Sequence, residues 1–325
     1  VIRRLEPVHR DEVLVGLNAP DDASVESIPE GKLVVQSVDA FRSMVDDCYL
    51  FGCIAANHCL SDLYAMGADP QSALAIASIP FGLEPKMETQ LEELLAGGIS
   101  VLNHAGAALV GGHTNEGAEL TLGFAVTGTI NRDDYLTKQG LTPGDALILT
   151  KPLGTGTLLA ADMHGKAKAR WIDGAIRSML VSNRDAASLL RSNGANACTD
   201  VTGFGLLGHL VEMTKASGVD VSLDLKMIPW LDGACHTAAA GLLSSLQPQN
   251  IRLRRALVLN KLDTTDPRYL LLFDPQTAGG LLAGVSSDRA GTCVAQLRSA
   301  GYSEATVIGV VEPSSNLDQP VTVTG

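Results

Sequence analysis

The first 130 residues carry two kinds of hydrophobic pattern, which together predict a mixture of strands and helices. Short runs rich in Val, Ile and Leu are typical of buried strands, whereas apolar residues that recur every three or four positions are typical of helices. The predicted strands are residues 32–38, 73–79, 107–112 and 119–130, and the predicted helices are 47–66 and 84–105. Gly67 directly follows the first helix and predicts a glycine C-cap.

A polar segment with Gly and Pro at residues 131–144 predicts a boundary. We therefore expect an N-terminal half of residues 1–135 and a C-terminal half of residues 136–325. The predicted elements of the second half are strands at 146–150, 219–225, 269–273 and 305–311 and a helix at 174–191. Strands and helices alternate without a regular βαβ rhythm, so the pattern favours an α+β fold over a doubly wound sheet.

Composition narrows the class of protein. The chain has 325 residues, 46% of them hydrophobic, and a formal net charge of −12. This acidity argues against a nucleic-acid partner, although an acidic enzyme can bind nucleotides when Mg²⁺ supplies positive charge locally. No apolar run is long enough to span a bilayer, and six scattered cysteines without CxxC pairs indicate reduced thiols, so we expect a soluble, cytoplasmic protein.

The segment from Asp200 to His209 has the strongest local signal for chemistry. A strand is predicted to end at Asp200, a turn with two glycines follows, and an apolar helix then begins. Such a turn places a carboxylate beside a helix N-terminus, where backbone N–H groups and the helix dipole favour phosphate. A carboxylate in that position can hold a divalent metal against the phosphate.

Further acidic residues follow strands, begin turns or lie on an apolar helix, and we take them as candidate Mg²⁺ ligands. Mg²⁺ requires oxygen ligands in octahedral geometry, which carboxylates from several elements can supply. The candidates are Asp21, Asp22, Asp39, Asp62 and Asp200. The alternative is that they are helix caps and solvated turn residues, which would be the better interpretation of Asp21 or Asp22 taken alone.

Two glycine-rich segments are candidate phosphate-binding turns. Gly111, Gly112, His113 and Thr114 are predicted to end a strand in a turn whose N–H groups form an anion nest. Lys151 opens a second turn, residues 151–156, before a helix. Neither segment is a Walker P-loop, and each taken alone is more often an ordinary turn. His209 and most cysteines are better interpreted as core residues.

Several motifs, in order along nearly the whole chain, resemble those of the selenophosphate synthetases, also called selenide, water dikinases. The matching segments are residues 21–23, 37–39, 45–47, 51–56, 60–67, 111–114, 150–154, 199–205 and 274–282. Any one of them is modest evidence, but their number and order make the resemblance specific.

The resemblance implies the fold of aminoimidazole ribonucleotide synthetase, with two α+β halves and a homodimer whose N-terminal halves build a β-barrel. It also implies an enzyme that converts ATP, selenide and water to selenophosphate, AMP and phosphate. In the family, aspartates corresponding to Asp21 or Asp22, Asp39, Asp62 and Asp200 hold Mg²⁺ against the ATP phosphates, and the segment from Gly111 to Thr114 belongs to the nucleotide site. The N-terminal half would thus bind ATP and Mg²⁺ and form the dimer.

The chain departs from the family in its N-terminal segment. The family carries a glycine-rich loop with Cys or selenocysteine followed by Lys, and residues 1–19 contain neither Cys nor Lys. The residues of that loop that the family uses for selenium handling and phosphate contact are therefore either missing or lost with a truncated N-terminus. His58 stands where the family usually has Asn, and Cys48 where it commonly has Pro. An imidazole prefers softer metals than an amide oxygen does.

Three alternatives follow from these departures. The domain could bind Mg-ATP and regulate or scaffold a partner without making selenophosphate. It could keep the fold but act on another substrate, as thiamine-monophosphate kinase does. It could also be the C-terminal domain of a fusion with a flavin- and pyridine-nucleotide-dependent oxidoreductase, a hypothesis that a full gene product without an upstream oxidoreductase would refute.

Overall fold

The computed structural model describes residues 4–17, 23–260, 263–315 and 318–325. The chain forms two units, Val1–Tyr135 and Leu136–Gly325, and each has its own sheet and core. Among the described residues, no helix is long and apolar enough to cross a membrane.

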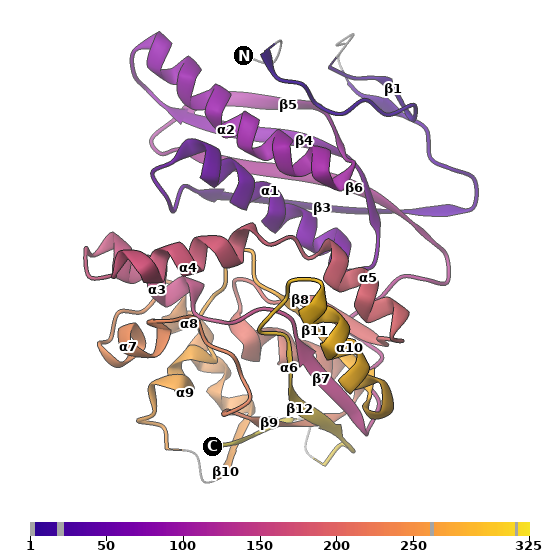
Figure 1. The fold of residues 1–325 in the computed structure, drawn as a ribbon, viewed down its shortest axis with the longest axis vertical. Coiled ribbons are helices and arrows are strands. Elements are labelled where there is room, and N and C mark those ends of the chain that lie inside the picture. The colour runs from indigo at the N-terminus through magenta and orange to yellow at the C-terminus, as the bar shows by residue number, and fades with distance from the viewer. Residues whose placement is uncertain (1–3, 18–22, 261–262, 316–317) are drawn as a thin grey trace. The chain divides into compact units, whose positions relative to one another are not determined.

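The N-terminal unit is built on a four-stranded sheet (Figure 1). Its strands, in spatial order, are β3 (Lys32–Arg42), β6 (Thr121–Asn131), β4 (Asp69–Pro80) and β5 (Ala108–Gly117). β4 and β5 run parallel, and the other neighbours are antiparallel. β1 (Val13–Val15) and β2 (Val25–Glu26) pair antiparallel in a separate two-stranded sheet.

Two helices, α1 (Cys48–Ala65) and α2 (Glu84–Ala105), cover one face of this sheet (Figure 1). The Asp47 carboxylate caps α1 by accepting the Leu50 N–H at 2.8 Å, and Gly67 follows the helix in the left-handed region as predicted. The two helices touch backbone to backbone, because a Cβ on Gly52 would lie 2.1 Å from the Leu94 carbonyl oxygen. The glycine therefore allows an approach that no larger residue permits.

The opposite face of the same sheet carries exposed apolar side chains. Alternate residues of β3 point away from α1, and Val38 among them is 59% exposed. Val34, Leu74 and Ile76 are also exposed on β3 and β4. Exposed apolar side chains on one face of a sheet often mark a surface that another protein chain covers.

The C-terminal unit contains a seven-stranded mixed sheet. Its strands, in spatial order, are β10 (Leu257–Asn260), β13 (Val321–Thr324), β9 (Asp220–Asp224), β12 (Thr306–Glu312), β7 (Asp145–Leu149), β11 (Leu281–Ser286) and β8 (Ala197–Asp200). Parallel pairing occurs between β10 and β13 and between β13 and β9, whereas the other pairs are antiparallel.

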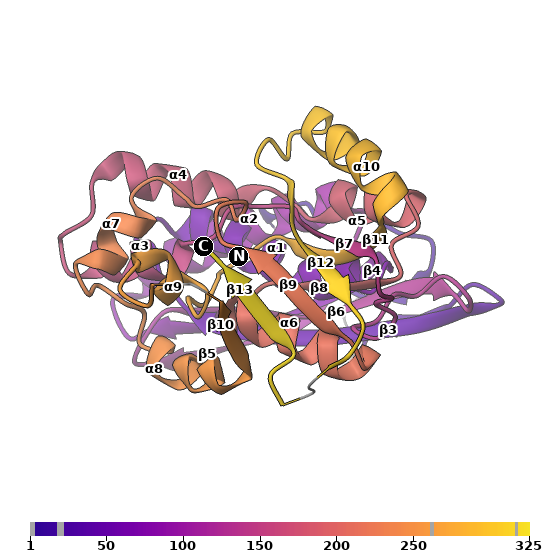
Figure 2. The same ribbon diagram turned by 90° about the horizontal axis from the view of Figure 1, so that it is seen from below.

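Helices pack on both faces of this sheet. Figure 2 shows α5 (Arg184–Ser192) and α10 (Ser287–Ser299) on one side and α6 (Gly205–Ser217) on the other. The core on the α6 side joins Leu147 and Leu149 of β7 to Leu206, Leu207 and Leu210 of α6. Further helical elements belong to the same unit. They are α3 (Thr155–Met163), α4 (Ala169–Leu180), α7 (Ala234–Ala239), α8 (Gln247–Asn250), η2 (Ile251–Ala256) and α9 (Pro267–Leu271).

Two sequence-based element predictions in this unit are wrong. Residues 269–273 were predicted as a strand, but most of them lie in α9 and the turn after it, because Pro267 starts the helix and Asp266 caps the Arg268 N–H. The single helix predicted at 174–191 is divided into α4 and α5. Val181 is extended, which ends α4 before Arg184 starts α5.

Candidate functional site

Three alternate residues of β3 each meet a residue of α1. The Ser37 hydroxyl donates to Asp62 Oδ2 at 2.5 Å, Asp39 Oδ2 lies 3.7 Å from His58 Nε2, and Phe41 packs against both Phe51 and His58. Residues two apart on a strand and four apart on a helix advance by similar distances, so the strand and the helix stay in step. This register brings the predicted metal ligands Asp39 and Asp62 together.

The electrostatics of this cluster favour a bound cation. Partial burial, followed by the negative charge of Asp62, raises the pKa of Asp39 to about 6. Two carboxylates that repel one another in a partly desolvated place are stabilised when a divalent ion lies between them. The two carboxylates offer the oxygen ligands that a hard divalent ion prefers, whereas the imidazole of His58 does not, so the role of Asp39 and Asp62 as Mg²⁺ ligands stays a prediction.

Two further predicted ligands, Asp21 and Asp22, lie outside the described residues. Within the part of the chain that the structure describes, no three His, Cys, Asp or Glu side chains are arranged to hold one ion. An ion bound by Asp39 and Asp62 would therefore need further ligands that are not His, Cys, Asp or Glu side chains of the described residues. Mg²⁺ commonly takes them from water and from the phosphates of a substrate.

The segment from Gly111 to Thr114 does not form the predicted turn. It continues β5, in parallel register with Leu74 to Ala77 of β4. A Cβ on Gly112 would lie 2.2 Å from the Ala75 carbonyl oxygen, so this glycine serves a close strand approach rather than a turn. The predicted anion nest is therefore wrong. His113 and Thr114 are nevertheless exposed on an edge strand, and their role in binding nucleotide stays a prediction.

Asp200 occupies the predicted strand–turn–helix. It is buried at the end of β8, and α6 begins at Gly205. The turn between them is fixed from three sides: Val201 N–H donates to the Gly280 carbonyl, Thr202 N–H to His209 Nε2, and the Asn250 side chain to the Gly203 carbonyl. His209 is buried in the core, as predicted, but only its Nε2 is hydrogen-bonded, because Nδ1 has no hydrogen-bond partner among the described residues. Burial lowers its pKa to about 4.

Lys151 lies two residues after β7, and Asp200 is the last residue of β8; β11 pairs with both of these strands. Lys151 is buried, and its ammonium donates to the carbonyls of Val181 at 2.5 Å and Ala278 at 3.1 Å. Burial lowers the pKa of Lys151 to about 7, although the charge of Asp200 opposes this shift. Ala278 has φ +45°, so the carbonyl that receives Lys151 belongs to a strained residue.

The predicted turn before a helix at residues 151–156 is confirmed, but its N–H groups are already used. Gln276 Oε1 accepts from Gly154 N and Thr155 N, and Asp274 Oδ2 accepts from Gly156 N at 3.1 Å. The N-terminus of α3 is therefore capped by protein groups, so we do not retain it as a phosphate-binding turn. The sequence reasoning treated residues 274–280 only as a strand break and a family motif, and it missed these roles of Asp274 and Gln276.

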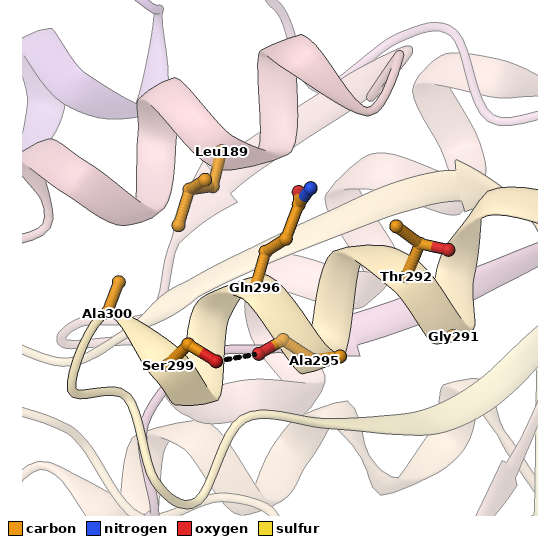
Figure 3. A pocket seen from close by; sticks show the side chains of 7 residues that line it. All are labelled: Leu189, Gly291, Thr292, Ala295, Gln296, Ser299 and Ala300. Carbon is orange, nitrogen blue, oxygen red and sulfur yellow. Dashed lines mark hydrogen bonds between the residues drawn. The ribbon is translucent and has the colours of Figure 1, made fainter.

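A groove between α5 and α10 lies apart from these residues. It is lined by Leu189, Gly291, Thr292, Ala295, Gln296, Ser299 and Ala300, and Figure 3 shows the Ser299 hydroxyl turned to the Ala295 carbonyl. None of these seven residues carries a charge. The groove is therefore a poor match for a polyphosphate, and the acidic clusters remain the better candidates.

Comparison with known proteins agrees with this arrangement. Residues 20–130 match the family described as AIR synthase related protein, N-terminal domain, and residues 142–319 match the corresponding C-terminal domain. Thiamine-monophosphate kinase from Stenotrophomonas maltophilia K279a is similar in structure, with a TM-score of 0.73 at 22% identity over 97% of this chain and 92% of that one. HypE from E. coli gives a TM-score of 0.70 at 22% identity, covering 94% and 87%.

Closer relatives are found by sequence. The selenide, water dikinase of Pelobacter propionicus is 42% identical over 92% of this chain and 85% of its own length. That of Caldanaerobacter subterraneus is 38% identical over 98% and 91%. Identities of this size over nearly the full length extend well beyond the site motifs, and the chain therefore belongs to the selenide, water dikinase family.

Proposed function

We propose that this chain is a phosphotransferase that converts ATP, selenide and water to selenophosphate, AMP and phosphate. The observation that carries the proposal is the paired carboxylates Asp39 and Asp62, held together by β3 and α1 in a chain of this family. Relatives named selenide, water dikinase are 37–42% identical over most of the chain.

Mg²⁺ is the metal that the donor set supports best. Asp39 and Asp62 would hold it in the N-terminal unit, Asp200 is a candidate ligand in the C-terminal unit, and Asp21 and Asp22 remain candidates from sequence. When bound, the ion supplies positive charge to the phosphates of the nucleotide. The protein's own contribution is positional. Ser37 fixes the Asp62 carboxylate by a hydrogen bond, and the turn after Asp200 is fixed by His209 and Asn250.

ATP is the proposed nucleotide. Two proteins of the same fold have been solved with nucleotides: the hydrogenase maturation protein HypE in complex with ATP, and a thiamine monophosphate kinase with AMPPCP and TMP. Here, the exposed stretch of β5 with Gly111, Gly112, His113 and Thr114 would contribute to the ATP site. The Lys151 ammonium donates to the carbonyls of Val181 and Ala278, and its contribution to the ATP site stays part of the proposal.

A homodimer through the N-terminal unit is part of the proposal. The exposed apolar face of β3 and β4 is the surface that a second copy would cover, as a barrel of two such sheets requires. Replacing Val38 by Lys places a charge on that face, and light scattering of the purified variant should then report monomers. A variant that stays dimeric would show that the interface lies on another surface. The free thiols of all six cysteines support a reducing, cytoplasmic location.

The reaction itself is tested by incubating the purified chain with ATP, Mg²⁺ and selenide under reducing conditions and following ³¹P NMR. We expect a selenophosphate resonance together with AMP and phosphate. Asp62→Asn should abolish it, whereas Asp133→Asn, which changes an exposed acid, should not. Binding of Mg-ATP without selenophosphate would contradict the proposed reaction and favour a nucleotide-binding role.

A further inference from the structure

Gln276 connects two parts of the C-terminal unit that are far apart in the sequence. Its side-chain amide lies at the start of α3, where Oε1 accepts from Gly154 N at 2.9 Å and from Thr155 N at 3.1 Å. Its main-chain N–H donates to the Thr202 carbonyl at 3.0 Å, in the turn that follows Asp200. One residue therefore binds the N-terminus of α3 through its side chain and the Asp200 turn through its backbone.

The Gln276 amide is buried and fully hydrogen-bonded. Nε2 donates to the carbonyl and to Oδ2 of Asp274, at 2.8 and 2.9 Å, and Oε1 also accepts from the Thr155 hydroxyl at 3.1 Å. Donors surround the amide oxygen and acceptors surround the amide nitrogen, so only one orientation of the amide satisfies these partners. Removal of the amide would leave several buried groups without this hydrogen bond.

Residues 276–281 run along the Asp200 turn with their backbones in close approach. Val201 N–H donates to the Gly280 carbonyl at 2.8 Å, and a Cβ on Gly279 would lie 2.0 Å from the Val201 carbonyl oxygen. β11 begins at the end of this segment and pairs with β8, whose last residue is Asp200. The two segments are so close that a shift of one must displace the other.

We propose that Gln276 is a positioning residue for the reaction, because its side chain fixes the backbone that holds the Asp200 carboxylate in place. The inference rests on the proposed function, which takes Asp200 as part of the site that acts on the nucleotide phosphates. In this role Gln276 acts through residues 276–281 and the Thr202 carbonyl, and not by contact with substrate.

A small displacement of the Asp200 carboxylate should affect the transition state more than the bound ground state. Charge is redistributed over the transferring phosphoryl group during the reaction, so the groups that act on it must be held within about 0.5 Å of their productive positions. Loss of the Gln276 hydrogen bonds frees residues 276–281 to shift against the turn. We therefore expect kcat to fall while KM for ATP changes little.

The test compares Gln276→Met with the wild type, in the full chain. Met is a flexible side chain of similar length, so the substitution removes the hydrogen bonds without opening a large cavity. In the ³¹P NMR assay for selenophosphate, kcat should fall about thirtyfold and KM for ATP should change by less than about threefold. Hydrogen exchange of the peptide that contains residues 201–205 should become faster, and this second measurement does not depend on turnover.

Thr155 offers a conservative pair of variants. Its hydroxyl donates to Gln276 Oε1 and accepts from Thr277 N at 3.0 Å. Thr155→Val removes the hydroxyl and should change kcat and hydrogen exchange in the same direction as Gln276→Met, by a smaller factor. Thr155→Ser keeps the hydroxyl and should restore both measurements to the wild-type values. This pair also tests the inference if Gln276→Met fails to fold, which circular dichroism reports.

Thr157→Val controls for a loss of stability alone. It removes buried hydrogen bonds from α3 to Leu242 and Thr237, so it should lower the free energy of unfolding without changing kcat or the exchange of residues 201–205. Unchanged exchange in Gln276→Met would show that Gln276 does not hold the turn. Faster exchange with an unchanged kcat would show that the position of the turn does not matter to the reaction. Either result would overturn the inference.

These outcomes differ from a failure of the proposed function. A wild type that makes no selenophosphate would overturn the proposed reaction and, with it, any effect of Gln276 on kcat. Selenophosphate made by the wild type and by Gln276→Met at the same rate would overturn the role of Gln276 alone.

Discussion

The two clusters of predicted site residues balance their charges in opposite ways. In the N-terminal unit, Asp39 is half-exposed, and the negative charge of Asp62 helps to raise its pKa. In the C-terminal unit, Asp200 is buried near the cation Lys151, whose ammonium also donates to two carbonyls. The first cluster brings two like charges together, whereas the second places a carboxylate near a lysine. Substitutions in the first cluster should therefore change the affinity for a metal ion. Substitutions in the second should change the free energy of unfolding.

The largest expected effect on stability comes from Asp274, a buried carboxyl of the C-terminal unit. It is fully buried at the N-terminus of α3, and burial raises its pKa from 3.8 to about 7. The folded state then binds this proton more tightly than the unfolded state, so its contribution to stability falls as pH rises from about 4 to about 7, by at most ~4 kcal/mol. Asp274→Asn, which keeps an oxygen for the Gly156 N–H, should remove that loss in urea unfolding at several pH values.

His209 should make stability depend on pH in the opposite direction to Asp274. Its folded pKa of about 4 lies below the usual 6.5, so the protein loses stability as pH falls from about 6.5 to about 4. His209→Gln removes this opposing effect. The free energy of unfolding should then fall more steeply as pH rises, because the contribution of Asp274 remains. If neither variant changes how the free energy of unfolding depends on pH, Asp274 and His209 do not control the pH dependence of stability.

Lys151→Met should destabilise the C-terminal unit by ~3 kcal/mol, measured by urea unfolding at neutral pH. The substitution leaves the carbonyls of Val181 and Ala278 without this donor and removes the positive charge near Asp200. Lys166→Met, at an exposed position, is the matched control and should cost little. Equal stability of the two variants would show that the buried ammonium is dispensable.

Asp39→Asn should have the smallest effect on stability and the opposite sign. Removing one of two like charges should stabilise the metal-free protein by ~0.5 kcal/mol, because solvent screens a side chain that is 42% exposed. The same variant should lose the stabilisation that added Mg²⁺ gives the wild type. Thermal unfolding with and without Mg²⁺ measures both effects, and a variant that still responds to Mg²⁺ would exclude Asp39 as a ligand.

Local pattern determined the elements of the N-terminal cluster. A short run rich in Val and Leu predicted the strand before Asp39, and apolar spacing predicted the helix that carries Asp62, so both elements were found from sequence. The turn after Asp200 was also predicted, since a strand end, glycines and an apolar run are all local signals. These features depend on residues that are neighbours in sequence, and local steric preferences decide them.

Only the tertiary structure decided which backbone and side-chain groups remain available. Gly112 looked like a turn glycine but serves a close approach to Ala75, which lies on another strand. The turn after Lys151 looked open to phosphate, yet Asp274 and Gln276, more than a hundred residues away, occupy its N–H groups. Sequence by itself determined where strands, helices and acidic residues fall. Which partner satisfies each polar group depends on segments that only folding brings together, because hydrogen bonds and charges act through space.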